Sequence, residues 1–198
     1  MTRAFTRIAF TDSVKEAQRR NGARAHVERL ETRGTPNDTL TPELAQYIEA
    51  RDSFFLATAT PEGWPYIQHR GGLPGFLRVI DPHTLAFADY AGNRQYLSVG
   101  NLDANDRVML FLMDWAAARR LKIWGRAEVI EDPAQAAALM PKGYDAQPER
   151  LIRIHVEAWD LNCNQHIPRR FSQRELAPVI AAYEERIAAL EQRLRSPS

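Results

Sequence analysis

Three polar clusters between residues 53 and 131 hold the side chains best suited to binding a ligand. They occupy residues 68–72 (QHRGG), 89–96 (DYAGNRQY) and 122–125 (KIWG). Each cluster places cations or amide groups beside small or aromatic residues. Cations and amides bind phosphate oxygens, whereas aromatic rings pack against planar molecules. This combination suits a planar aromatic ligand that carries a phosphate, and flavin mononucleotide (FMN) fits that description.

The second cluster has the features of a phosphate site. Gly92 and Asn93 predict a turn, and the following residues 94–105 predict a helix. The first turn of a helix presents unpaired backbone N–H groups, and the forked guanidinium of Arg94 can hold two phosphate oxygens. The alternative for these residues is a solvent-exposed helix cap with a surface arginine.

The other two clusters offer positive charge and an aromatic ring. Arg70 ends a predicted strand, and Gly71 after it allows a close backbone approach. A reduced flavin carries negative charge near N1 and O2, which Arg70 or Lys122 could stabilise. Trp124 lies on the same strand face as Lys122 and either flanks the ring or belongs to the core. His69 either titrates near neutral pH or is an ordinary packing residue.

Composition excludes several function classes. The 198 residues include 26 Lys and Arg and 25 Asp and Glu, so the net charge of +1 gives no basic field for nucleic acid. No Gly-x-Gly-x-x-Gly motif is present, which argues against a Rossmann domain for NAD. No apolar run approaches the roughly 20 residues of a membrane span, and the first residues lack the apolar core of a signal peptide. We therefore expect a soluble, cytoplasmic protein.

The single cysteine, Cys163, excludes an intrachain disulfide. Its spacing from His155 and His166 matches no zinc pattern, so we expect no metal site. Without a paired base in a known motif, Cys163 is not expected to act as a nucleophile.

The pattern of elements divides the chain into three regions. Residues 1–52 form a helical arm, in which Ser13 and Glu16 suggest a capping box and Gly22 a helix stop. A second helix of this arm starts at Thr41 and Pro42. Residues 53–160 are predicted to form strands at 53–60, 64–70, 76–80, 84–89, 108–113, 119–131 and 150–159, with helices at 94–105 and 134–140. Short strands with tight turns indicate an antiparallel barrel or sandwich.

Residues 161–198 are predicted to end in an amphipathic helix. Its apolar residues alternate steps of four and three, which is a heptad pattern: Leu176, Ile180, Tyr183, Ile187, Leu190 and Leu194. Fewer than three heptads do not hold as an isolated coiled coil, so we expect the helix to pack on the barrel or on a partner chain. Ser172 could begin a capping box, but Pro178 would then fall inside the helix, so we place the start near Glu175.

Taken together, these residues resemble the pyridoxamine 5′-phosphate oxidase-like family of FMN-binding split β-barrels. The resemblance covers about residues 50–160 and rests on segments 55–59 (FLATA), 63–70 (GWPYIQHR), 85–95, 101–102, 105–111 and 121–127 (LKIWGRA). It implies a mainly β fold, a six- or seven-stranded antiparallel split barrel with an N-terminal helical arm and a C-terminal helix. It also implies a homodimer with two FMN sites at the subunit interface, and it implies neither a nucleic-acid nor a membrane partner.

The resemblance assigns cofactor-binding roles by position. Arg70, with His69 and Gly71 beside it, would contact the flavin or its phosphate side. The phosphate segment would comprise Asp89, Tyr90, Asn93, Arg94 and Gln95, supported by Asn101, while Lys122 and Trp124 would reach the cofactor from the long strand. Position and chemistry alone suggest that Gln165, His166 and Arg169 close the site.

Two departures from the family pattern argue against vitamin B6 oxidation. Gln95 stands where the oxidase has lysine, and the residues that bind pyridoxal phosphate are not recognisable. We therefore predict an FMN-dependent oxidoreductase with an unidentified substrate. The alternatives are a non-catalytic FMN-binding or redox-sensing module, in which Trp64 or the 165–166 segment blocks the ring, and a barrel that binds a deazaflavin or haem, with His69, His155 or His166 as axial ligand.

Overall fold

The computed structural model describes residues 3–33, 35–162 and 165–195. The chain divides into two compact units. The first comprises residues 1–113 and 120–163, and the second comprises residues 114–119 and 164–198.

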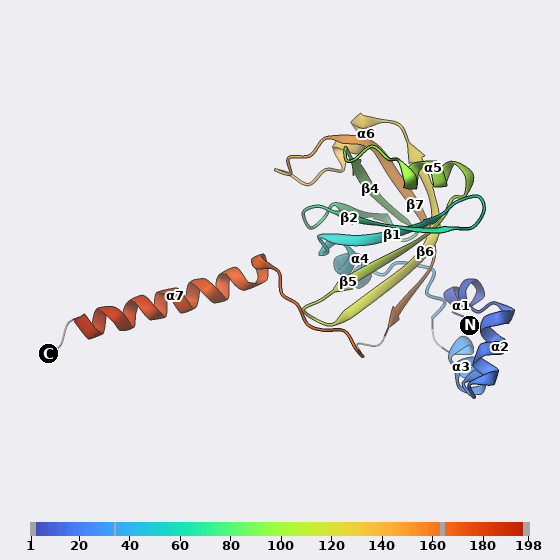
Figure 1. Cartoon of the computed structure of the whole chain (residues 1–198), viewed down its shortest axis with the longest axis horizontal. Coiled ribbons are helices and arrows are strands. Elements are labelled where there is room, and N and C mark those ends of the chain that lie inside the picture. The colour runs from blue at the N-terminus through green and yellow to red at the C-terminus, as the bar shows by residue number, and fades with distance from the viewer. Residues whose placement is uncertain (1–2, 34, 163–164, 196–198) are drawn as a thin grey trace. The chain divides into compact units, whose positions relative to one another are not determined.

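A seven-stranded antiparallel sheet forms the body of the protein (Figure 1). Its strands are β1 (Ser53–Ala59), β2 (Pro65–Gly71), β3 (Leu77–Asp81), β4 (Thr84–Tyr90), β5 (Arg107–Asp114), β6 (Arg119–Ile130) and β7 (Pro148–Asn162). Their order across the sheet is β2-β1-β5-β6-β7-β4-β3. The predicted mainly β, antiparallel fold with flanking helices is therefore confirmed, with seven strands rather than six.

Alternating side chains separate the two faces of the sheet. Leu110 and Leu112 of β5, and Leu121 and Ile123 of β6, are fully buried in the core. Residues between them point to the outer face, where β1 and β5 pair Phe55 with Phe111. A strand has a side-chain period of two, so one apolar set fills the core while the other lines the outside.

Helix α5 (Leu97–Ala104) follows strand β4, and helix α6 (Pro133–Ala138) follows strand β6. Helix α5 begins three residues later than the predicted start at 94. The reason is that Arg94 and Tyr96 have left-handed φ angles of 59° and 51°, which a right-handed helix does not contain. Helix α6 is capped by Asp132, whose Oδ1 accepts from the backbone N–H groups of Ala134 and Gln135.

The described part of the N-terminal arm contains four helices, α1 (Ala4–Ala9), α2 (Asp12–Arg20), α3 (Arg24–Thr32) and α4 (Pro42–Glu49). The predicted capping box at Ser13 is wrong, because α2 begins earlier: Thr11 is the cap and its Oγ1 accepts from the Val14 N–H at 3.3 Å. Thr41 caps α4 and Pro42 occupies its first turn, as predicted.

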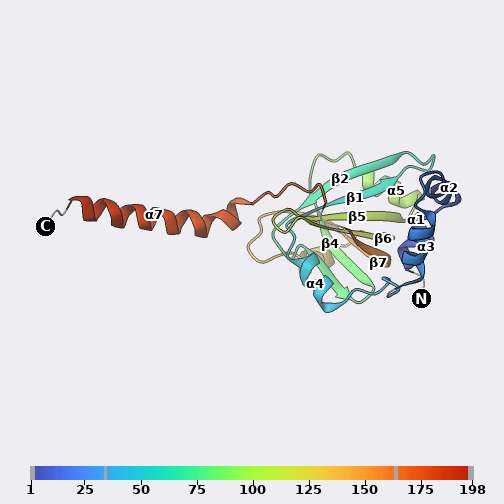
Figure 2. The ribbon, with the colours of Figure 1, turned by 90° about the horizontal axis from the view of Figure 1, so that it is seen from below.

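The arm is joined to the sheet by specific contacts. Helices α1, α2 and α3 lie together beside one end of the strands (Figures 1 and 2), and the Phe5 ring of α1 stacks on Trp124 of β6 with centroids 5.9 Å apart. The Trp159 backbone N–H donates to the Asn37 carbonyl at 2.8 Å, and its indole N–H donates to the Thr39 carbonyl at 2.9 Å. These bonds place the connection before α4 against β7.

The second unit contains helix α7 (Gln173–Arg195). The predicted start near Glu175 is wrong, because Ser172 and Glu175 cap each other: the Ser172 N–H donates to Glu175 Oε2 at 2.7 Å, and the Glu175 N–H donates to Ser172 Oγ at 3.2 Å. Pro178 therefore lies inside the helix, where it removes one backbone hydrogen bond. In the part of the chain that the structure describes, no helix is long and apolar enough to cross a membrane.

Candidate functional site

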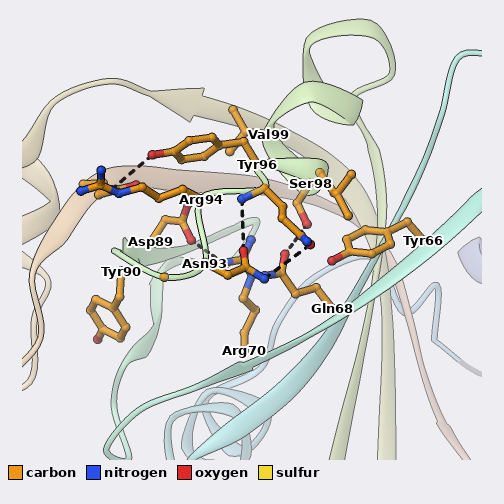
Figure 3. Close-up of a pocket in the computed structure, with 14 residues that line it drawn as sticks. Tyr66, Gln68, Arg70, Asp89, Tyr90, Asn93, Arg94, Tyr96, Ser98 and Val99 are labelled. Atoms are coloured by element: carbon orange, nitrogen blue, oxygen red, sulfur yellow. Dashed lines mark hydrogen bonds and ion pairs between the residues drawn. The ribbon is translucent and has the colours of Figure 1, made fainter.

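A pocket of about 190 Å³ opens where β2, β4 and the first turn of α5 meet (Figure 3). The loop 91–96 forms one wall. The lining comprises Tyr66, Gln68, Arg70, Asp89, Tyr90, Gly92, Asn93, Arg94, Gln95, Tyr96, Leu97, Ser98, Val99 and Glu149. Six of the residues predicted to bind the cofactor are thus brought together here: Arg70, Asp89, Tyr90, Asn93, Arg94 and Gln95.

Strand β2 lines the pocket with every second residue. Tyr66, Gln68 and Arg70 face the pocket and are partly buried, whereas His69 points to the opposite, exposed face. The His69 ring packs edge-on against Phe55, with centroids 5.6 Å apart. The sequence placed Gln68 in the first polar cluster, but His69 and not Gln68 was assigned to the cofactor. The two-residue period of a strand already puts Gln68 on the same face as Arg70.

Gln68 helps to fix the start of α5. Its Oε1 accepts a hydrogen bond from the buried Ser98 hydroxyl at 2.8 Å. Leu97, Ser98 and Val99 form the first turn of α5 and line the pocket, and the first N–H groups of a helix have no intrahelical acceptor. The pocket therefore receives the positive end of a helix dipole.

A buried ion pair forms the floor of the pocket. Arg70 donates to Asp89 Oδ1, and Arg150 Nε of β7 lies 3.9 Å from Asp89 Oδ2. Burial raises the pKa of the Asp89 carboxyl above its ordinary value, and the positive charges of Arg70 and Arg150 offset part of that rise. The Nε atoms of both arginines are buried and have no hydrogen-bond partner within the described residues. Buried donors of this kind are normally satisfied, so these two atoms are exceptions at the floor of the pocket.

The loop 91–96 holds Arg94 in a strained backbone conformation. Arg94 and Tyr96 both lie in the left-handed region, where a non-glycine residue costs about 1–2 kcal/mol. Asn93 Oδ1 accepts from the Gln95 backbone N–H at 3.1 Å, which fixes the turn between them. Strain of this kind gathers at functional sites.

A second cavity of about 140 Å³ adjoins the pocket. It shares Arg70, Asp89 and Tyr90 with the pocket and adds His69 and Gly71. Burial and the neighbouring Tyr144 raise the pKa of the Tyr90 hydroxyl, which has no hydrogen-bond partner among the described residues.

The remaining predicted residues lie elsewhere. Asn101 is buried and does not line the pocket; its Nδ2 donates to Thr58 Oγ1 at 2.9 Å and ties α5 to β1. Lys122 pairs with Asp160, with Nζ and Oδ2 3.2 Å apart, and points outward from β6.

Trp124 also points outward from β6. It lines a separate pocket of about 410 Å³, together with Ile8, residues 57–59 and residues 107–109. Within one chain, therefore, the third sequence cluster does not join the first two.

Gln165, His166 and Arg169 belong to the second unit and are exposed. His166 has a left-handed φ of 61°. Cys163 lies outside the described residues. Among the residues that the structure describes, no group of three or more His, Cys, Asp or Glu side chains could hold a metal ion.

Comparison with known proteins identifies the family. The family model described as pyridoxamine 5′-phosphate oxidase matches residues 40–163, which is more than half of the chain. The chain belongs to the pyridoxamine 5′-phosphate oxidase family. This confirms the resemblance drawn from the sequence. No curated protein matches the chain.

Several solved structures are similar in fold. An FMN-binding protein from Syntrophomonas wolfei is 12% identical, with a TM-score of 0.48 over 75% of this chain and 96% of that one. A Clostridium acetobutylicum protein related to general stress protein 26 is 17% identical, with a TM-score of 0.46 over 68% and 94%. An F420 reductase is 22% identical, with a TM-score of 0.44 over 61% and 98%.

Proposed function

We propose that this member of the family is an FMN-binding flavoprotein, with the FMN phosphate held in the pocket between β2, β4 and α5. The observation that carries this proposal is the meeting of the α5 N-terminus with the side chains of Arg70 and Arg94 in one pocket. Backbone N–H groups and guanidinium groups are the donors that bind phosphate in proteins.

The charges of the pocket fit a phosphate. Asp89 is paired with Arg70 and Arg150, and Glu149 lies 3.1 Å from Arg150, so both lining carboxylates are already compensated. Within the described residues, the exposed Arg94 makes no ion pair, which leaves its guanidinium for a ligand. The Arg70 guanidinium lines the same pocket and brings a second positive charge to it.

The size of the pocket fits only part of FMN. Sites for ligands of this size occupy roughly 300–1,000 Å³, whereas the pocket measures about 190 Å³. The volume suits the phosphate and its attachment, and the ring system then needs a further surface.

We infer that a second copy of the chain supplies that surface. The outer face of β2, β1 and β5 is apolar and exposed: Ile67 is 64% and Phe55 38% exposed, and they neighbour Met109 and Phe111. Lys122 and Trp124 project from the outer face of β6, the next strand. A homodimer formed through this face would bury these side chains, as the family resemblance implies, and would form two equivalent sites.

Bound FMN supplies the redox chemistry, since its ring accepts and donates electrons. The residues of this chain bind and orient it. The α5 N-terminus and Arg94 hold the phosphate, and Gln68 fixes the first turn of α5 through Ser98. Lys122, which is paired with Asp160, would approach the ring from the dimer face. We propose an oxidoreductase of the pyridoxamine 5′-phosphate oxidase-like type that acts on a small molecule.

An absorbance spectrum of the purified protein tests the proposal. Protein mixed with FMN and freed of excess FMN should retain flavin absorbance bands at about 375 and 450 nm, with one flavin per chain. Riboflavin, which lacks the phosphate, should be retained far less. No retained flavin, or equal retention of riboflavin, would contradict the phosphate site. Bleaching of the 450 nm band by NADH or NADPH, faster than for free FMN, would support an enzyme over a non-catalytic module.

A further inference from the structure

Helix α7 carries an apolar stripe that is exposed along its whole length. The six stripe residues are each at least 39% exposed: Leu176 39%, Ile180 52%, Tyr183 65%, Ile187 55%, Leu190 49% and Leu194 81%. They recur in alternating steps of four and three over the 23 residues of the helix. This spacing keeps the stripe on one side of a helix and is the pattern of a coiled-coil seam.

The heptad assignment fixes which residues flank the stripe. With Ile180, Ile187 and Leu194 at position a, the d positions are Leu176, Tyr183 and Leu190. The flanking charges are then sorted by sign: Glu184 and Glu191 fall at e, whereas Arg186 and Arg193 fall at g. Isoleucine at a with leucine at d favours two-stranded coiled coils.

The sorted charges discriminate between the two orientations of a helix pair. In a parallel pair, each g residue faces the e residue five positions on in the other chain, so Arg186 meets Glu191 and the attraction occurs twice by symmetry. In an antiparallel pair, g faces g and e faces e, so arginine meets arginine and glutamate meets glutamate. Like charges in these positions are unfavourable.

We propose that α7 binds the α7 helix of a second copy of this chain as a parallel two-stranded coiled coil. The Glu191 carboxylate already has Arg195 of its own helix at 3.4 Å, and both side chains are exposed, so a second cation can approach it. When two copies of this helix pair in parallel, the arginines at g of one face the glutamates at e of the other. This complementarity within one sequence indicates that the partner is a second copy of the chain rather than another protein.

The short length of the helix sets the condition for pairing. A stripe of fewer than three heptads that contains Pro178 is weak by itself. Two helices tethered to one dimer have a high effective concentration, so the inference rests on the homodimer proposed above. Pairing of α7 and retention of FMN are nevertheless measured separately, and either can fail alone.

Disulfide trapping in the full-length chain tests the proposal. Cys163 is replaced by Ser so that only introduced thiols react, and Ile180→Cys is compared with the control Ala182→Cys, which falls at the outward c position. In a parallel pair, equivalent a positions lie opposite each other. Ile180→Cys should therefore form a dimer of twice 22.6 kDa under mild oxidation. We expect this dimer to form at least about ten-fold faster than that of the control.

Two further variants keep the test decisive. Tyr183→Cys provides a d position in case Ile180→Cys disturbs the helix. The reversal Arg186→Glu should slow trapping, and Arg186→Glu with Glu191→Arg should restore it.

Three results would overturn the proposal. Equal trapping at the seam and at the control position would place the stripe against another surface. Preferential trapping between Ile180→Cys and Leu190→Cys chains would show an antiparallel pair. Failure of the double charge reversal to restore trapping would remove the electrostatic argument. Flavin content, measured on the same samples, reports separately on the phosphate site.

Discussion

Replacement of Arg94 by alanine should weaken FMN binding about ten- to thirty-fold. The guanidinium is exposed, so its charge-assisted bond to phosphate belongs at the lower end of the usual 1.5–3 kcal/mol, or about 1.5–2 kcal/mol. Each 1.4 kcal/mol corresponds to a factor of ten in Kd. Because Arg94 already has a φ of 59°, alanine inherits the same backbone strain, and the change reports on the side chain alone. Glycine at this position would also relieve the backbone strain, so the loss of the side chain could not be measured by itself.

Quenching of flavin fluorescence on titration with protein provides the assay, with FMN and riboflavin as paired ligands. Arg94→Ala should lower FMN affinity by the stated factor and leave riboflavin affinity within about two-fold, because riboflavin has no phosphate to lose. Arg78→Ala is the matched control: Arg78 is an exposed strand arginine outside the pocket, and its loss changes the net charge equally. Equal losses for both ligands, or an equal loss in the control, would refute the assignment of Arg94 to the phosphate.

Three further predictions concern the surroundings of the pocket. Asn101→Ala should lower the free energy of unfolding by about 1–3 kcal/mol in urea, because it leaves the buried Thr58 hydroxyl without its partner. Gly125→Ala should cost about 1–3 kcal/mol or more, since the new Cβ would overlap the His155 carbonyl oxygen; an unchanged melting temperature would contradict this. The Asp89 carboxyl should titrate above 3.8 by carbon NMR. Because the folded state then holds this proton more tightly, the contribution to stability is complete below pH 3.8 and is lost as pH rises through the folded-state pKa, a loss that Asp89→Asn should lack.

The sheet could be predicted from sequence because its signals are local. Alternating apolar residues and turns such as the one before residue 64 located all seven strands, mostly to within one or two residues. The helix boundaries failed where the deciding feature was a backbone conformation. The residue types at 94 and 96, arginine and tyrosine, do not predict left-handed φ angles, so the predicted start of α5 was too early. At α7, the proline outweighed the capping box in the sequence argument, although the reciprocal Ser172–Glu175 bonds hold the helix start in place.

The pocket was predicted in part for a similar reason. Arg70, Asn93 and Arg94 belong to segments in which cations and amide groups cluster in the sequence, and the structure brings them together. Glu149 was missed because β7 starts before the predicted residue 150, and long-range pairing with β4 places it at the pocket. The separation of Trp124 from this pocket follows from the strand order, in which β6 is next to neither β2 nor β4, and a single strand's pattern does not encode that order.

The strand order has a consequence for how the chain reaches its native state. The hairpins β1–β2 and β3–β4 join residues close in sequence, whereas β1 pairs Leu56 with Leu110, and β4 pairs Ala86 with Arg153. Closing the long loop between two distant strands costs conformational entropy before their pairing stabilises the chain. Sheets rich in such pairs therefore fold in roughly milliseconds to seconds. Because the β2–β4 pocket needs β7 to hold Arg150 against Asp89, we expect the binding site to mature only after the slowest pairing step, with the hairpins already in place.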